Sequence, residues 1–266
     1  MSRVLALARA GFLTDASYRV AMIFSLAGLV ATLVPVYLIA RAMQPLMEGA
    51  IRGQGGEYFA FVLLGMMTTY FVATACNALP GAVSSGVRNG TLEALLATPA
   101  PLPSLLAGLA AYPLAWTLLR GCVLVATGAL LGARFAWGGA AGSLVILALI
   151  VLAYVPFGLI GAALLLAFRT TGPLLQGVLT VSMLLGGVYY PTHVIPEWIR
   201  PLSAAVPLTY GLRALRRTLL EGASPLAVAG DVGMLALFAI GGMMIGAGAL
   251  AMGLRYARRT GTLAQY

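Results

Sequence analysis

The sequence predicts an all-α membrane protein, and three observations support this fold class. Hydrophobic residues make up 61% of the 266 residues, and charged residues only 9%. Six apolar stretches are each long enough for the roughly 20 residues that a helix needs to cross a bilayer. These stretches lack the polar faces at a 3.6-residue period that soluble helices show. Because backbone groups find no water in lipid, apolar runs of this length are expected to be helical.

We expect the six stretches to form six transmembrane helices. They run roughly Val20–Ala40, Tyr58–Pro80, Leu105–Ala133, Phe135–Phe168, Thr170–Ile195 and Val232–Leu254. Arg120 is the one charged residue well inside a stretch, and Pro35, Pro113 and Pro156 are expected to kink their helices. No connecting stretch is large enough for a separate soluble domain. Residues 1–266 are therefore expected to form a single transmembrane domain.

Residues 1–18 precede the first predicted span and mix apolar side chains with Arg3, Arg9 and Asp15. This composition favours an amphipathic helix that lies on the inner membrane surface. The alternative is that they form the solvated start of the first span. The first apolar stretch is too long for the core of a signal peptide, so we expect it to be retained as a helix.

The formal net charge is +9. The charges are spread along connectors and chain ends without a dense basic run, so we expect contact with anionic lipid headgroups and no nucleic acid partner. All 16 basic residues are arginine. A phosphate-binding P-loop needs a lysine to reach the β- and γ-phosphates. If ATP drives this protein, another chain must bind it.

The distribution of arginine predicts the orientation. With six crossings, both chain ends lie on the same side. Excluding the long connector before the last span, eight arginines fall on that side and three on the other: Arg3, Arg9, Arg19, Arg88, Arg169, Arg255, Arg258 and Arg259 against Arg41, Arg52 and Arg134. Cytoplasmic loops carry the excess of positive charge, so both termini are expected to be cytoplasmic.

Residues 84–98 are predicted to form a short helix, roughly Ser85–Ala97, on the cytoplasmic side between the second and third spans. Leu92, Leu95 and Leu96 have i, i+3, i+4 spacing and would share one face. Thr98-Pro99 ends the helix. A short amphipathic helix in this position suits the binding of a soluble partner. A plain interfacial turn is the alternative.

Residues 191–222 form the other unusual stretch, which is rich in proline. Tyr189, Tyr190 and Trp198 fit the aromatic belt at a membrane boundary. The spacing of three arginines would place them on one helical face: Arg213, Arg216 and Arg217. We predict two short helices here that enter the outer leaflet without crossing it.

Two motifs in these stretches resemble the permease subunit of type-2 ATP-binding-cassette (ABC) exporters. The first reads Gly90-Thr91-Leu92-Glu93, then Leu95-Leu96 and Thr98-Pro99, between spans two and three. The second reads Tyr190-Pro191, Pro196-Glu197-Trp198 and Pro207-Leu208-Thr209-Tyr210, with Arg213, Arg216 and Gly222, before span six. Length, six-span layout and the order of both motifs agree, so the resemblance covers essentially the whole chain.

The resemblance implies roles for several segments. Residues 84–98 would be the coupling helix that docks on the ATPase subunit, through Arg88, Gly90, Thr91, Leu92, Glu93, Leu95 and Leu96. Residues 191–222 would form re-entrant extracellular helices that include Tyr190, Pro191, Trp198, Pro207, Tyr210, Arg213 and Arg216. Residues 1–18 would be an interfacial helix. Gly86 and Val87 stand where family members often carry an acidic or charged group.

The resemblance also implies a function, as the permease subunit of an exporter in a prokaryotic cytoplasmic membrane. The substrate would be hydrophobic or amphipathic: a drug or lipid-like molecule, or else a glycan. A partner ATPase would bind ATP and Mg, this chain would hold no cofactor, and a second permease subunit, identical or a sibling, would complete the pore. Arg120, Tyr112, Trp116 and Tyr154 are candidates for lining the pore or binding substrate. Helix packing is the alternative for each of them.

Two other classes fit less well. A secondary transporter or channel not driven by ATP usually places acidic residues in its spans, and this chain has acids only in connectors or at span ends. A membrane enzyme needs clustered carboxylates, a metal-binding histidine set or a Ser/His pair. The chain has one histidine, His193, and the spacing of Cys76 and Cys122 suggests no metal site. We therefore expect no catalytic and no metal site.

Overall fold

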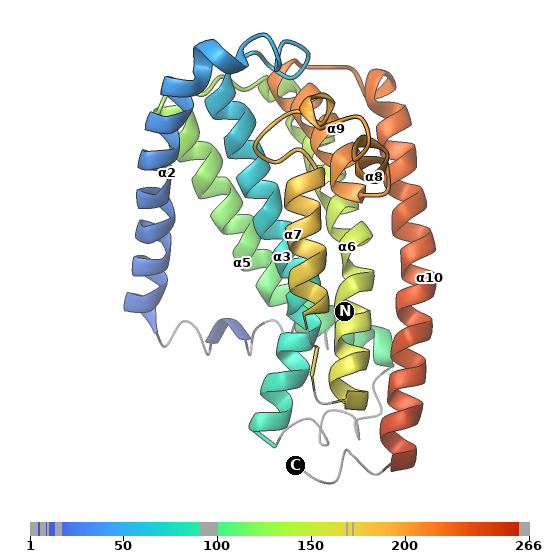
Figure 1. Ribbon diagram of the computed structural model, residues 1–266. Helices are drawn as coiled ribbons and strands as arrows, with labels where there is room; N and C mark the ends of the chain where they lie inside the picture. The colour runs from blue at the N-terminus through green and yellow to red at the C-terminus, as the bar shows by residue number, and fades with distance from the viewer. Residues whose placement is uncertain are drawn as a thin grey trace.

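The computed structural model describes residues 5, 9, 11–13, 18–90, 101–168, 170–171 and 173–260. In this part of the chain the regular elements are helices, and Figure 1 shows them as a bundle of long helices with short ones gathered at one end. The longer helices are α2 (Arg19–Met47), α3 (Tyr58–Arg88), α5 (Leu102–Leu130), α6 (Ala140–Phe168), α7 (Leu174–Leu185), α9 (Pro207–Leu220) and α10 (Ala229–Thr260). The short elements are η1 (Trp137–Gly139), η2 (Thr192–Val194), α8 (Arg200–Ala204) and η3 (Pro225–Val228).

Five helices in the described part are long and apolar enough to cross a membrane: α2, α3, α5, α6 and α10. In the described part of the fifth predicted span, Thr170–Ile195, the α-helix is limited to the 12 residues of α7, about 18 Å against a hydrocarbon layer of about 30 Å. The helix stops because Gly187 adopts a φ of 78°, a conformation that favours glycine. The expected all-helical membrane fold is thus confirmed, with five long helices and one short apolar helix.

Helix α3 is the centre of the bundle, and 72% of its most apolar 18-residue segment is buried. It packs against α2, α5, α6, α7 and α9, while α10 packs along α6 at the edge seen on the right of Figure 1. Close approach depends on small residues: a Cβ on Gly65 of α3 would collide with the carbonyl oxygen of Val188. On α10, Gly242 and Gly246 lie against Pro156 of α6. These glycines allow backbones to meet without intervening side chains.

The prolines do not interrupt the long helices. Pro35, Pro113 and Pro156 lie inside continuous helices, and α3 continues through Pro80 to Arg88. The prediction that a separate helix begins at Ser85 is therefore wrong, since residues 85–88 form the last turn of α3. Gly90 follows with a φ of 66°. The remainder of the predicted coupling helix lies outside the described residues.

The short helices gather at the end of the bundle where α2 ends and α3 begins (Figure 1). Helix α8 has only five residues, and α9 has 14, of which ten are buried. Pro201 is the second residue of α8 and Pro207 the first residue of α9, positions where the missing N–H has no partner within the helix. The opposite end of the bundle holds the start of α2 and the ends of α3 and α10. Of residues 1–18, the described residues 5, 9 and 11–13 are helical, and Gly11 lies against the ring of Tyr112.

Candidate functional site

Arg216 of α9 is a buried cation at the end of the bundle that carries the short helices. Its residue surface is 2% exposed. Nε donates to Phe61 O at 3.2 Å, and Nη2 donates to Phe61 O at 3.0 Å and Val188 O at 2.9 Å. Nη1 donates to Gly187 O at 2.8 Å and to Gln54 Oε1 at 3.4 Å. The guanidinium has five N–H donors, so all of them have acceptors.

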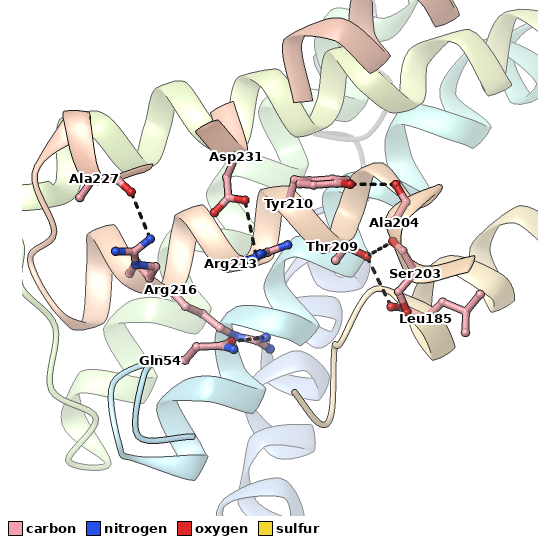
Figure 2. A network of polar contacts seen from close by, with 11 residues as sticks. Gln54, Leu185, Ser203, Ala204, Thr209, Tyr210, Arg213, Arg216, Ala227 and Asp231 are labelled. Atoms are coloured by element: carbon pink, nitrogen blue, oxygen red, sulfur yellow. Dashed lines mark hydrogen bonds and ion pairs between the residues drawn. The ribbon is translucent and has the colours of Figure 1, made fainter. Parts of the chain in front are cut away.

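The acceptors of Arg216 are neutral dipoles from three separate segments. They belong to α3, to the segment after α7 and to the connector between α2 and α3 (Figure 2 shows Gln54 of that connector). The Phe61 ring lies 3.3 Å from the guanidinium carbon. Desolvation by burial lowers the pKa of Arg216 to about 9, which is still above neutral pH. The side chain therefore stays charged and joins α9 to the centre of the bundle.

The connector between α2 and α3 is itself held by side chains. The Gln44 amide donates to Gly56 O at 2.8 Å and accepts from Tyr58 N at 2.7 Å. Gly55 N donates to Glu221 Oε1 at 3.0 Å, just after α9. Glu57 Oε2 accepts from Arg134 N at 3.1 Å, in the connector between α5 and α6. Side-chain hydrogen bonds thus tie this connector to α2, to the residue that follows α9 and to the connector between α5 and α6.

The three arginines of α9 do not share one environment, which corrects the expectation of a single arginine face. Arg213 Nε lies 3.5 Å from Asp231 Oδ1 in the first turn of α10. Arg217 Nη1 donates to Ala227 O at 3.1 Å. Figure 2 shows Arg213 directed toward Asp231 while Arg216 extends to Gln54. A sequence pattern gives the spacing of these residues but not the neighbours that bury one of them.

The remaining residues of the predicted re-entrant segment have mixed roles. Tyr210 Oη donates to Ala204 O at 3.0 Å, and Tyr190 Oη donates to Leu184 O at 2.6 Å. Pro191 and Pro207 are buried. Trp198 is 80% exposed, which suits an aromatic residue at a membrane interface.

Three of the four candidate pore residues form a stripe on α5. Tyr112, Trp116 and Arg120 follow one another at four-residue spacing and share a face. Arg120 Nη2 donates to Ser25 Oγ of α2 at 2.6 Å, and its guanidinium carbon lies 5.4 Å from the centre of the Trp116 ring. An arginine in the middle of a span costs about 2.5–3.5 kcal/mol on insertion scales, so facing lipid is unfavourable.

Tyr154, the fourth candidate, does not join that stripe. It lies on α6 with no exposed surface, and its hydroxyl donates to Ser182 Oγ of α7 at 2.7 Å. The structure therefore places it in the packing between α6 and α7. Of the predicted coupling residues, Arg88 is exposed at the end of α3 and Gly90 follows it. Thr91, Leu92, Glu93, Leu95 and Leu96 lie outside the described residues.

Exposed polar side chains on α3 and α7 were not predicted from the sequence. Asn77 is exposed near the middle of α3 and donates to Ala73 O at 2.8 Å on its own helix. Gln176 and Thr180 are exposed on α7. Leu175 and Pro80 both flank Gly161, so the start of α7 lies near the level of Asn77. The sequence did contain an indication of this polar face, because Asn77 is a lone amide side chain inside an apolar stretch.

These features define a multi-pass integral membrane protein with one polar end network and a partly polar, uncovered face. A family model described as ABC-2 type transporter matches residues 7–220. The chain belongs to this family, and the match confirms the resemblance that the two motifs indicated. It is a membrane transport component, not a catalytic domain, and permeases of this family work with an ATP-binding-cassette subunit. No curated protein matches the chain.

Proposed function

We propose that this chain is the permease subunit of an exporter that moves a hydrophobic or amphipathic molecule outward across a prokaryotic cytoplasmic membrane. A drug or a lipid-like molecule is the substrate class we favour, with a glycan as the second. The energy comes from ATP and Mg bound by a separate ATPase subunit. Family membership over residues 7–220 is the observation that carries this proposal. The lack of lysine supports it, because a P-loop cannot be formed in this chain.

The orientation we propose follows from charge. The bundle end with α8 and α9 faces the outside, and the end with the start of α2 and the ends of α3 and α10 faces the cytoplasm. Arg19, Arg88 and Arg255 belong to the second group. A cytoplasmic excess of arginine in short connectors supports this direction. Both termini are then cytoplasmic, with α8 and α9 as helices that enter the outer leaflet.

A second permease subunit covers the exposed face of α3 and α7 in our proposal. Asn77 lies about 6 Å from the midpoint of α3, which is well inside the hydrocarbon layer. A polar side chain at this depth is expected to face a protein neighbour or a water-filled cavity. This chain leaves Asn77, Gln176 and Thr180 uncovered. A facing subunit would shelter them and place them beside the transport path.

Helix α3 provides the mechanical connection in the proposed mechanism. Its cytoplasmic end, at Arg88, leads into the segment we assign as the coupling helix. Its outer end carries Phe61, whose carbonyl accepts two of the bonds from Arg216. ATP binding that closes the ATPase subunits would move the coupling segment. A continuous helix of 31 residues would pass that movement to the outer network and open the path outward.

The experiment is transport into inside-out membrane vesicles. The chain is expressed with the ATPase subunit, and uptake of a fluorescent amphipathic dye is followed after ATP is added. We expect uptake with ATP and Mg, and none with a non-hydrolysable ATP analogue or with the permease omitted. Uptake without ATP but with a proton or sodium gradient would contradict the proposal and favour a secondary transporter.

A further inference from the structure

In the described part of the chain, Arg216 is buried and Arg120 is partly buried within a long apolar helix, and their hydrogen bonding differs. Arg216 has an acceptor for each of its N–H groups. Arg120 makes one hydrogen bond in the described part of the chain, from Nη2 to Ser25 Oγ. Its Nε is buried without a partner among the same residues. The Trp116 ring attracts the cation through its face, but this contact provides no hydrogen-bond acceptor for the Nε–H group.

The depth of Arg120 limits what can reach it. Along α5 it lies about 27 Å from the first residue and about 15 Å from the last. This position is inside the hydrocarbon layer, so a hydrated inorganic anion does not reach it by partition from water. The alkyl chain of an anionic amphiphile enters the bilayer and holds the head at its boundary, and pairing with the guanidinium would offset the cost of drawing that head to the depth of Arg120. Phosphate and carboxylate also match the planar fork of a guanidinium, which can donate two parallel hydrogen bonds.

We propose that Arg120, with Ser25 beside it between α2 and α5, binds the anionic head of an amphiphile of the alkyl phosphate class. The guanidinium donates to the phosphate oxygens, and the Ser25 hydroxyl fixes its position. The alkyl chain lies along the stripe formed by Trp116 and Tyr112. If the proposed transport function holds, on which this role in transport rests, the site selects substrates that carry an anionic group.

Trp116 provides a reporter at the site. The chain has three tryptophans, so Trp137→Phe and Trp198→Phe leave Trp116 as the only indole. The full-length chain with these two changes is placed in phosphatidylcholine nanodiscs without ATP. Dodecyl phosphate and, separately, neutral dodecyl maltoside are titrated while Trp116 emission is recorded. We expect a saturable change in emission with dodecyl phosphate and none with dodecyl maltoside, because only the phosphate head would bind the guanidinium that lies over the Trp116 ring.

Variants in the same background test the assignment. Arg120→Gln should weaken dodecyl phosphate binding about tenfold or more, since a charged hydrogen-bonding pair is lost. Arg41→Gln is the matched control. Arg41 also lies over an aromatic ring, with its guanidinium carbon 5.5 Å from the centre of the Tyr37 ring, but it is near the outer end of α2. The affinity of the Arg41→Gln variant for dodecyl phosphate should equal that of the parent. Arg120→Met removes the charge at an intramembrane position and should insert at least as well as the parent, so it replaces Arg120→Gln if that variant does not fold.

Three results would overturn the proposal: equal responses to the two amphiphiles, unchanged affinity in Arg120→Gln or Arg120→Met, or an equal loss in Arg41→Gln. The measurement needs neither ATP nor the ATPase subunit. A chain that binds dodecyl phosphate but has no ATPase partner would contradict the proposed function and leave this site standing. A chain that transports with ATP but shows no saturable response to dodecyl phosphate would support the proposed function and contradict this binding site.

Discussion

The side chain of Arg216 on α9 donates two hydrogen bonds to the carbonyl oxygen of Phe61 on α3, at 3.2 and 3.0 Å, and its guanidinium carbon lies 3.3 Å from the centre of the Phe61 ring. One residue of α3 thus supplies both an acceptor and an aromatic face. The pair joins the short helix α9 to α3, the most buried of the long apolar helices in the described part of the chain. In the proposed mechanism this pair would transmit movements of α3 to the end of the bundle that carries α9.

Replacing Arg216 should destabilise the protein strongly. In Arg216→Ala the carbonyl acceptors at Phe61, Gly187 and Val188 lose their donor, and a buried polar group left without a partner typically costs about 1–3 kcal/mol. Thermal unfolding of the detergent-purified chain measures the effect. Arg213→Gln is the control on the same helix. Its ion pair with Asp231 is half exposed on the arginine side, so we expect a loss below about 1 kcal/mol. Equal losses in both variants would contradict the special role of Arg216.

A methyl group on Gly65 should disturb the contact between α3 and the segment after α7. The Cβ of Gly65→Ala would collide with Val188 O, which also accepts from Arg216, and overpacking of this kind costs about 1–3 kcal/mol. Gly81→Ala on the same helix meets nothing within 4 Å and should raise stability by about 0.5–1 kcal/mol. The midpoint temperatures of the two variants should therefore shift in opposite directions. A shift in the same direction would show that Gly65 does not approach Val188 this closely.

The proposed second permease subunit at the exposed face of α3 can be tested by cross-linking. In a background with Cys76→Ala and Cys122→Ala, Asn77→Cys should give a disulfide-linked dimer when membranes are oxidised, because in the proposed homodimer the two introduced cysteines would face each other. Leu237→Cys on α10, which is 63% exposed, serves as the comparison and should stay monomeric on a denaturing gel. A dimer from Leu237→Cys but not from Asn77→Cys would move the interface to the other side of the bundle.

Changes in the assigned coupling segment should separate ATP hydrolysis from transport. We expect Glu93→Ala, or proline in place of Leu95, to leave expression and membrane insertion intact while ATP-dependent dye uptake is lost. The physical reason is a lost contact with the ATPase subunit, or a broken helix in the case of proline. Arg52→Gln, in the connector at the opposite end, is the control. Unchanged uptake and unchanged substrate-stimulated hydrolysis in both variants would remove the coupling role.

Much of the fold could be predicted from the sequence because lipid leaves few choices for a long apolar stretch. The positions of α2, α3, α5, α6 and α10 follow the predicted spans closely. The length of α7 was overestimated, since Gly186-Gly187 and Pro191 were taken into an apolar span. The start of a separate helix at Ser85 was wrong because α3 accommodates Pro80 and runs on to Arg88.

The candidate site was less predictable, because burial of a charge depends on residues far apart in the sequence. The family motif included Arg216, but its acceptors come from Gln54, Phe61 and Gly187, which no local pattern connects. Likewise the four-residue spacing of Tyr112, Trp116 and Arg120 is visible in the sequence, whereas the contact with Ser25 is not. Tyr154 looked equivalent to the α5 residues and is in fact packed between α6 and α7.

In the function we propose, this permease uses energy supplied by a separate ATPase. The most direct test is to purify the tagged chain from native membranes in mild detergent, identify what accompanies it, and measure ATP hydrolysis with and without the accompanying subunit. We expect an ATP-binding-cassette protein in stoichiometric amount, and hydrolysis that disappears when that protein is stripped away. Hydrolysis by the stripped chain, or repeated purification without any such protein, would contradict an energy source in a separate ATPase.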